Sequence, residues 1–115
     1  MDKKNDAQAI ADGVNALDVH DRVGNLKAII NGDFKTEPVE DGTGNPFKQS
    51  AYDGTQKLEP YTKAADKVEV LQTAAKLVGD NAIAEGNDWL QADLNDFSRQ
   101  IETTFLDEDE DIAVD

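Results

Sequence analysis

Residues 64–79 read AADKVEVLQTAAKLVG and carry the clearest helical pattern of the chain. Five apolar residues follow in alternating steps of four and three, and three more widen the same face: Ala64, Val68, Leu71, Ala75 and Val78, with Val70, Ala74 and Leu77. Pro60 suits the first turn, Thr62 is the expected N-cap, and Gly79 is expected to end the helix. This stretch therefore predicts a core helix.

Three further segments show helical periodicity, at residues 6–17, 21–31 and 87–106. The last of them has Trp89 beside its apolar face, and Asn81 is an alternative earlier start for it. Its apolar face consists of Leu90, Leu94, Phe97, Ile101 and Phe105. Together the four segments predict an all-α fold, a small antiparallel bundle of about four helices that forms a single domain over residues 1–106.

The segment 33–60 lacks this periodicity and contains all three prolines of the chain. It is much longer than the ~12–15 residues of an ordinary loop. We expect an irregular connection, with a short hairpin around Asp41-Gly42 as the alternative. Its aromatic residues are expected to pin it to the helices: Phe34, Phe47 and Tyr52.

Charge and composition exclude several classes of function. The chain has 25 acidic and 11 basic residues and a formal net charge of -14. Since phosphate contacts need Lys and Arg, we expect no direct binding to nucleic acid or to an anionic membrane, and the charge favours a basic protein surface as the partner. The absence of Cys and the presence of one His exclude disulfides, thiolate nucleophiles, cysteine zinc sites and any site that needs two imidazoles.

The acidic residues concentrate towards the C-terminus. Ten of them lie between Glu85 and Asp111, against one base, Arg99. We expect an acidic ridge on the last helix, followed by a flexible acidic tail at residues 107–115. A solvated surface that only improves solubility is the alternative interpretation. The residues predicted to bind the partner are Asp88, Asp93, Asp96, Glu102, Asp107, Glu108, Asp109, Glu110 and Asp111.

The sequence offers little catalytic chemistry. A serine–histidine reaction centre would need His20 with Ser50 or Ser98, and neither serine lies in a nucleophile elbow. We expect His20 to pack or cap at a bend between the first two helices. Two runs, the acidic 107–111 and the mixed polar 41–45 with Asp41, Thr43 and Asn45, have the alternate spacing of a calcium loop, but each has another residue where that loop needs glycine. We therefore expect no catalytic residues, no cofactor and no metal, and a protein that is not an enzyme.

In length, helical content and acidic charge, the chain resembles small acidic proteins of phages and mobile elements that mimic DNA. The resemblance is one of composition and includes no shared motif. It implies an inhibitor or modulator that occupies the basic surface of a nucleic-acid-binding protein. The alternative is a phage virion or assembly accessory protein that acts through contacts in a helical oligomer. Since the start of the sequence lacks an apolar signal segment, we expect a cytoplasmic location, which would be the host cytoplasm for a phage protein.

Overall fold

The computed structural model describes the backbone of residues 2–31 and 46–114 and the side chains of residues 2–30 and 48–105. All regular structure in these ranges is helical, which confirms the all-α prediction. The described part holds five α helices rather than four, and a short 3-10 turn: α1 (Lys3–Asn15), η1 (Val19–Asp21), α2 (Arg22–Asn31), α3 (Pro46–Leu58), α4 (Ala64–Ala84) and α5 (Leu90–Val114).

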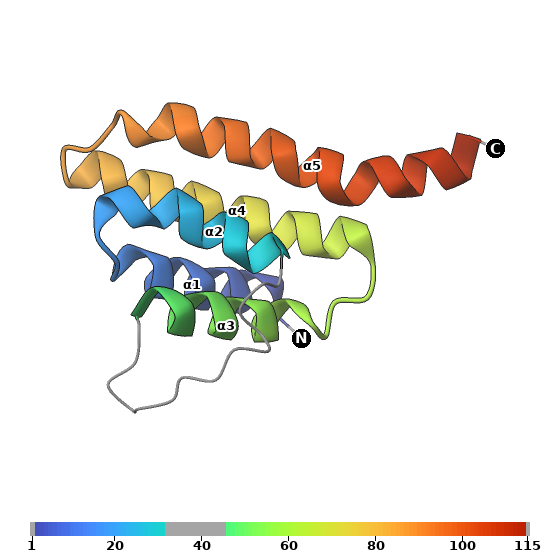
Figure 1. Ribbon diagram of the computed structural model, residues 1–115, viewed down its shortest axis with the longest axis horizontal. Helices are drawn as coiled ribbons and strands as arrows, with labels where there is room; N and C mark the ends of the chain where they lie inside the picture. The colour runs from blue at the N-terminus through green and yellow to red at the C-terminus, as the bar shows by residue number, and fades with distance from the viewer. Residues whose placement is uncertain (1, 32–45, 115) are drawn as a thin grey trace.

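The helices form a bundle of mixed direction (Figure 1). Helices α1 and α2 are antiparallel, as are α4 and α5, so the two predicted hairpins are present. However, α1 and α4 run side by side in the same direction, and Lys3 Nζ of the first turn of α1 lies 2.8 Å from Asp66 Oδ1 in the first turn of α4. Because α2 and α3 also run in the same direction, α4 starts at the same end of the bundle as α1. The predicted antiparallel bundle therefore holds for the two hairpins but not for the packing of α1 against α4.

Helix α3 is the main departure from the sequence prediction, since 33–60 was expected to be irregular. Pro46 occupies the first helical position, where its missing N–H costs nothing. The buried side is made by Ala51, Thr55 and Leu58, which follow at helical spacing. Only one of these three is a large apolar residue, so hydrophobic periodicity did not reveal the helix. Residues 32–45, including the hairpin considered at Asp41-Gly42, lie outside the described part.

Helix α3 packs closely on α2 because it carries a glycine at the contact. A Cβ atom at Gly54 would lie 2.5 Å from Ile29 Cδ1 of α2. The buried Thr55 hydroxyl donates to the Ala51 carbonyl oxygen at 2.9 Å, so this polar group has a hydrogen-bond partner within α3. The small residues that weaken the hydrophobic pattern are thus the ones that let the two helices approach.

Helix α4 differs from its prediction at both ends. It runs to Ala84 and does not stop at Gly79, which is buried and lies where a Cβ would be 3.3 Å from Leu94 Cδ1 of α5. Gly79 therefore serves close helix packing rather than termination. At the start, Lys63 rather than Thr62 is the N-cap, and it makes no side-chain capping hydrogen bond.

Helix α5 begins at Leu90, slightly later than expected, and its backbone continues to Val114. It thus extends through most of the segment 107–115 that we predicted as a flexible tail. The side chains from residue 106 onward lie outside the described part, so the acidic tail stays a prediction.

The core lies along α4, which packs against both α1 and α5, and it continues between α1, α2 and α3. Among the described side chains Phe97 is the largest that is fully buried, and Leu90, Leu94 and Ile101 of the same helix are also buried. Phe105 is half-buried against this core. The apolar face predicted for the last helix is confirmed over these residues. Within the described residues, none of the helices has the length and apolar character to cross a membrane.

Tyr61 connects the α3–α4 turn to α1. Its ring is 2% exposed, and its hydroxyl donates to the Asp6 carboxylate. This hydrogen bond, together with burial, raises the pKa of Tyr61 to about 12.

The raised pKa of Tyr61 predicts stability at alkaline pH. Because the folded pKa lies above the unfolded value, the protonated phenol stabilises the fold below pH 10, and this contribution is lost as the pH rises through about 12. Ultraviolet titration of tyrosinate should show one ionisation near this value, and Asp6→Asn should move it down. An unchanged titration curve in Asp6→Asn would show that the hydrogen bond to Asp6 does not raise the pKa of Tyr61.

Candidate functional site

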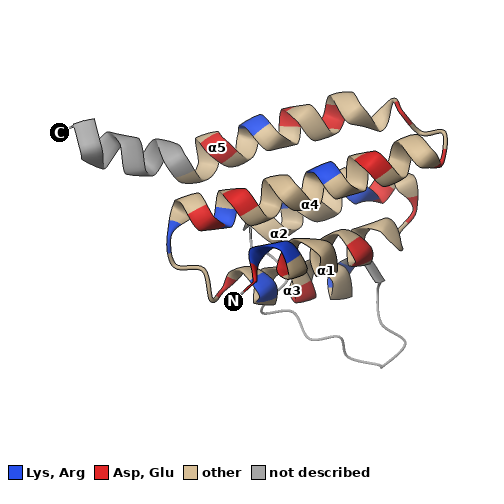
Figure 2. Ribbon diagram, turned by 180° about the vertical axis from the view of Figure 1, so that it is seen from behind, with Lys and Arg blue, Asp and Glu red and all other residues tan. Residues whose placement is uncertain are grey.

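The predicted acidic residues of the last helix are exposed where the structure describes them. Asp88, Asp93, Asp96 and Glu102 all lie on the surface. Figure 2 shows acidic positions recurring along the described part of α5. The side chains of the predicted residues 107–111 lie outside the described part, so their exposure stays a prediction.

The exposed carboxylates of α5 do not form a single line. At ~100° per residue, Asp93 and Glu102 lie on opposite flanks of the helix, and Asp96 points more directly away from the core. Glu102 accepts a hydrogen bond from Gln72 Nε2 of α4 at 3.0 Å. Arg99, the basic residue of this helix, donates to Asp96 one turn earlier. The acidic surface thus wraps around the exposed half of α5.

Glu85 belongs to a different arrangement from the exposed acids. Arg22, which is only 5% exposed, donates to Glu85 Oε1 at 2.8 Å and to the backbone carbonyls of Leu17 and Asn15, each at 3.1 Å. The Arg22 hydrogen bond is the main cause that holds the pKa of the Glu85 carboxyl below its usual value. The ion pair joins the start of α2 to the end of α4. Arg22 is not recognisable from the sequence, because a lone arginine in a helix gives no signal of burial.

The turn between α4 and α5 exposes two large apolar side chains. Gly86 has a φ of 87°, a left-handed conformation that suits glycine, and the Asn87 N–H donates to the Ala82 carbonyl at 2.7 Å. Ile83 before this turn is 52% exposed, and Trp89 after it is 49% exposed. They are the large hydrophobic residues that remain exposed among the described side chains.

His20 lies at the predicted bend and contacts this turn. Its ring centroid is 5.6 Å from that of Trp89, with the planes inclined by 30°. Its Nδ1 lies 3.1 Å from Asp18 Oδ2, and Asp18 also accepts from the His20 backbone N–H at 3.0 Å. This backbone hydrogen bond is the main cause that lowers the pKa of Asp18. His20 thus belongs to a surface cluster on η1.

The remaining candidates for chemistry do not assemble into a reaction centre in the described part. The Ser50 hydroxyl donates to Asn25 Oδ1 at 2.8 Å, and the Ser98 carbonyl accepts from Gln72. Within the described residues, no three His, Asp or Glu side chains are grouped to hold a metal ion. The two runs with calcium-loop spacing have their side chains outside these residues. The absence of enzymatic activity stays a prediction.

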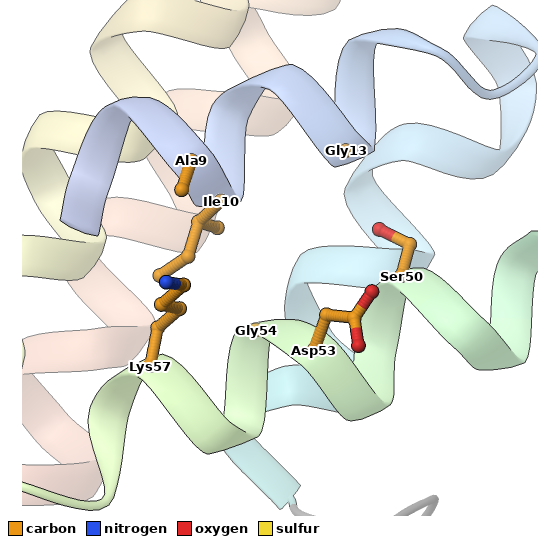
Figure 3. Close-up of a pocket in the computed structure, with 7 residues that line it drawn as sticks. All are labelled: Ala9, Ile10, Gly13, Ser50, Asp53, Gly54 and Lys57. Carbon is orange, nitrogen blue, oxygen red and sulfur yellow. The ribbon is translucent and has the colours of Figure 1, made fainter. Parts of the chain in front are cut away.

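The hollows between helices of the described part include two small ones. Figure 3 shows one between α1 and α3, of about 70 Å³, whose walls include Ala9, Gly13 and Gly54. Another of about 270 Å³ lies between α4 and α5, and Gln72, Gln91 and Asn95 are among the residues that line it. Sites for small molecules usually have ~300–1,000 Å³. The exposed surfaces of α5 and of the α4–α5 turn are therefore the stronger candidates for function.

Comparison with models of protein families, with curated proteins and with solved structures finds no match.

Proposed function

We propose that this protein is a non-enzymatic, acidic binding protein that occupies the basic surface of a nucleic-acid-binding protein and so inhibits or modulates it. The observation that carries the proposal is the exposed set of carboxylates at Asp88, Asp93, Asp96 and Glu102. Arg99, the one base within the described part of α5, donates to Asp96 within the same helix. This surface therefore keeps a net negative charge.

A carboxylate surface of this kind can compete for sites that hold phosphates. Duplex DNA presents one charge per ~1.7 Å of its axis, and a protein that binds it releases counterions. The carboxylates of α5 are sparser, but they lie on a rigid helix, so little conformational entropy is lost when they bind. Binding should weaken as salt rises, because salt screens exposed charges.

The distribution of these carboxylates favours a concave partner. Since Asp93 and Glu102 lie on opposite flanks of α5, a flat surface cannot contact both, whereas a cleft that receives the helix can. Clefts lined by Lys and Arg are the usual form of nucleic-acid sites that enclose a strand. The arrangement therefore supports a groove or channel as the binding site.

The proposal predicts that capture of the partner depends on where the charge lies. The test bait carries Asp88→Asn, Asp93→Asn, Asp96→Asn and Glu102→Gln. The control bait loses the same charge from exposed acids on other elements: Asp12→Asn, Asp53→Asn, Glu59→Gln and Asp80→Asn. Proteins captured from bacterial lysate at about 0.1 M salt are identified and quantified by mass spectrometry.

We expect the wild type and the control bait to capture nucleic-acid-binding proteins that elute as salt rises. The test bait should capture at least about tenfold less of the same proteins. Circular dichroism checks that all three baits remain helical. Equal capture by the test bait and the wild type would refute the proposal and leave the acidic surface as a solubilising feature.

The alternative is an assembly protein that pairs with copies of itself. The exposure of Ile83 and Trp89 favours this alternative, because contacts between subunits bury such side chains. The net charge of -14 opposes it through repulsion between copies. Light scattering at low and at high salt decides between them, since a salt-resistant oligomer supports assembly and a monomer supports the acidic binding protein.

A further inference from the structure

The end of the bundle formed by η1 and the α4–α5 turn has the features of an anchor for a protein partner. We name the surface formed by His20, Ile83 and Trp89 the turn surface. We propose that Trp89 inserts into an apolar pocket, rimmed by Lys or Arg, on the basic protein that α5 contacts. This inference rests on the proposed function and adds to it the residue that anchors the partner.

Trp89 is unusually exposed for a large aromatic side chain. Two other aromatic residues of the described part, Phe97 and Tyr61, are buried, with 0% and 2% exposed. Trp89, in contrast, is 49% exposed. Ile83 on the other side of the same turn is 52% exposed. Tryptophan is among the residues most enriched at the centres of protein interfaces, where it loses water on binding. An isolated exposed apolar residue needs no explanation, but here a tryptophan and an isoleucine are both exposed at the two ends of one turn.

Trp89 already contacts the bundle before any partner binds. Its indole lies against the His20 ring with centroids 5.6 Å apart, and the Nδ1 atom of that imidazole lies 3.1 Å from Asp18 Oδ2. The turn itself is fixed by Gly86 and by the ion pair of Arg22 with Glu85 one residue earlier. An anchor that is already ordered loses less entropy on binding.

The charge of the segments that carry the turn surface determines the type of partner. Residues 16–21 and 83–90 contain four acids and no Lys or Arg: Asp18, Asp21, Glu85 and Asp88. The adjacent Arg22 is buried and engaged with Glu85. In contrast, Lys3, Lys4 and Lys63 lie where α1 and α4 begin, at the opposite end of the bundle (Figures 1 and 2). An acidic rim around an apolar centre fits a basic protein and repels a second copy of this chain.

The turn surface is continuous with the acidic surface of α5. Asp88 is the first of the predicted binding residues and directly precedes Trp89, and α5 begins at the next residue. One partner can therefore contact the indole and the first carboxylates of the helix together. The apolar contact supplies salt-resistant affinity, and the carboxylates supply the salt-sensitive part.

The test uses Trp89→Ala and Trp89→Phe baits in the same quantitative capture at about 0.1 M and about 0.5 M salt. We expect Trp89→Ala to reduce capture of the nucleic-acid-binding proteins by at least about tenfold, and Trp89→Phe to restore most of it. His20→Ala should give an intermediate loss, because the indole loses its support. Unchanged far-ultraviolet circular dichroism shows that these exposed substitutions leave the bundle folded.

The outcomes separate this inference from the proposed function. If Trp89→Ala captures the same proteins as the wild type, and the test bait with four neutralised carboxylates does not, then Trp89 is not the anchor. The proposed function still holds in that case. If Trp89→Ala loses capture and the test bait with four neutralised carboxylates captures normally, the acidic surface does not bind the partner. This result refutes the proposed function, and with it the inference that the partner is basic. If light scattering shows that the wild type is an oligomer and Trp89→Ala is a monomer, the occupant of the turn surface is a second copy and the inference is wrong.

Discussion

Arg22→Ala should lower the free energy of unfolding by about 3 kcal/mol. Arg22 is 5% exposed and donates to the carboxylate of Glu85 and to the carbonyls of Asn15 and Leu17. The substitution leaves these acceptors in a part-buried site without their donor, and it also removes the packing of the arginine stem. Urea denaturation followed by circular dichroism measures the change.

The matched control for this prediction is Arg99→Ala. Arg99 forms an ion pair one turn apart with Asp96, but both side chains are largely exposed, at 77% and 69%. Exposed ion pairs contribute little because water and salt screen them. A loss in Arg22→Ala no greater than in Arg99→Ala would show that the buried ion pair does not connect α2 to α4 as the structure indicates.

The ion pair of Arg22 with Glu85 also predicts how the free energy of unfolding changes at acidic pH. Because Arg22 holds the folded pKa of Glu85 below its unfolded value of 4.5, Glu85 stabilises the fold above that pH. The contribution is lost as the pH falls through the folded pKa. Asp66, whose pKa Lys3 lowers, acts with the same sign. Arg22→Ala should therefore show a shallower loss of stability than the wild type between neutral pH and about pH 3.

Phe97→Ala should lower the free energy of unfolding by about 3–5 kcal/mol. Phe97 is the largest fully buried side chain, and it lies on α5 facing the core that α4 shares. A typical domain has only ~5–15 kcal/mol of stability, so this cavity removes a large part of it. Since α5 carries the exposed carboxylates, loosening this helix should also reduce capture of the partner. Calorimetry measures the loss of stability.

Phe105→Ala is the control for this effect. Phe105 lies on the same face of α5, two turns further on, but it is only half-buried. Its truncation opens less of a cavity, so the loss should be clearly smaller. Equal losses at the two positions would mean that α5 is not held chiefly by the contacts around Phe97.

The fold was predictable from sequence where large apolar residues recur at helical spacing. Residues 64–78 and 90–105 therefore lie in helices that turn the predicted apolar faces to the core, although the ends of these helices differ from the prediction. Helix α3 was missed because its inner side is made by Ala51, Gly54 and Thr55, which carry little hydrophobic signal. Gly79 was misread as a helix end, since close packing against Leu94 depends on a neighbour that the sequence does not reveal.

The candidate site was predictable only in part. Composition identified the acidic surface, and the structure describes its first four members as exposed. The sequence could not indicate that Asp93 and Glu102 occupy opposite flanks, or that Glu85 is paired with Arg22 across the bundle. Trp89 was expected beside the apolar face of its helix. Its exposure follows from where the turn at Gly86 places it, next to His20, which is 69 positions away along the chain in sequence.

The most direct test of the account is competition with DNA. The wild-type protein is immobilised, bound to the proteins it captures from lysate, and then challenged with increasing duplex or single-stranded DNA at constant salt. We predict that DNA displaces the captured nucleic-acid-binding proteins, and that the protein in turn inhibits their binding to DNA. If DNA leaves them bound, or binds as a third component of the complex, the protein does not occupy a nucleic-acid site and the central claim is wrong.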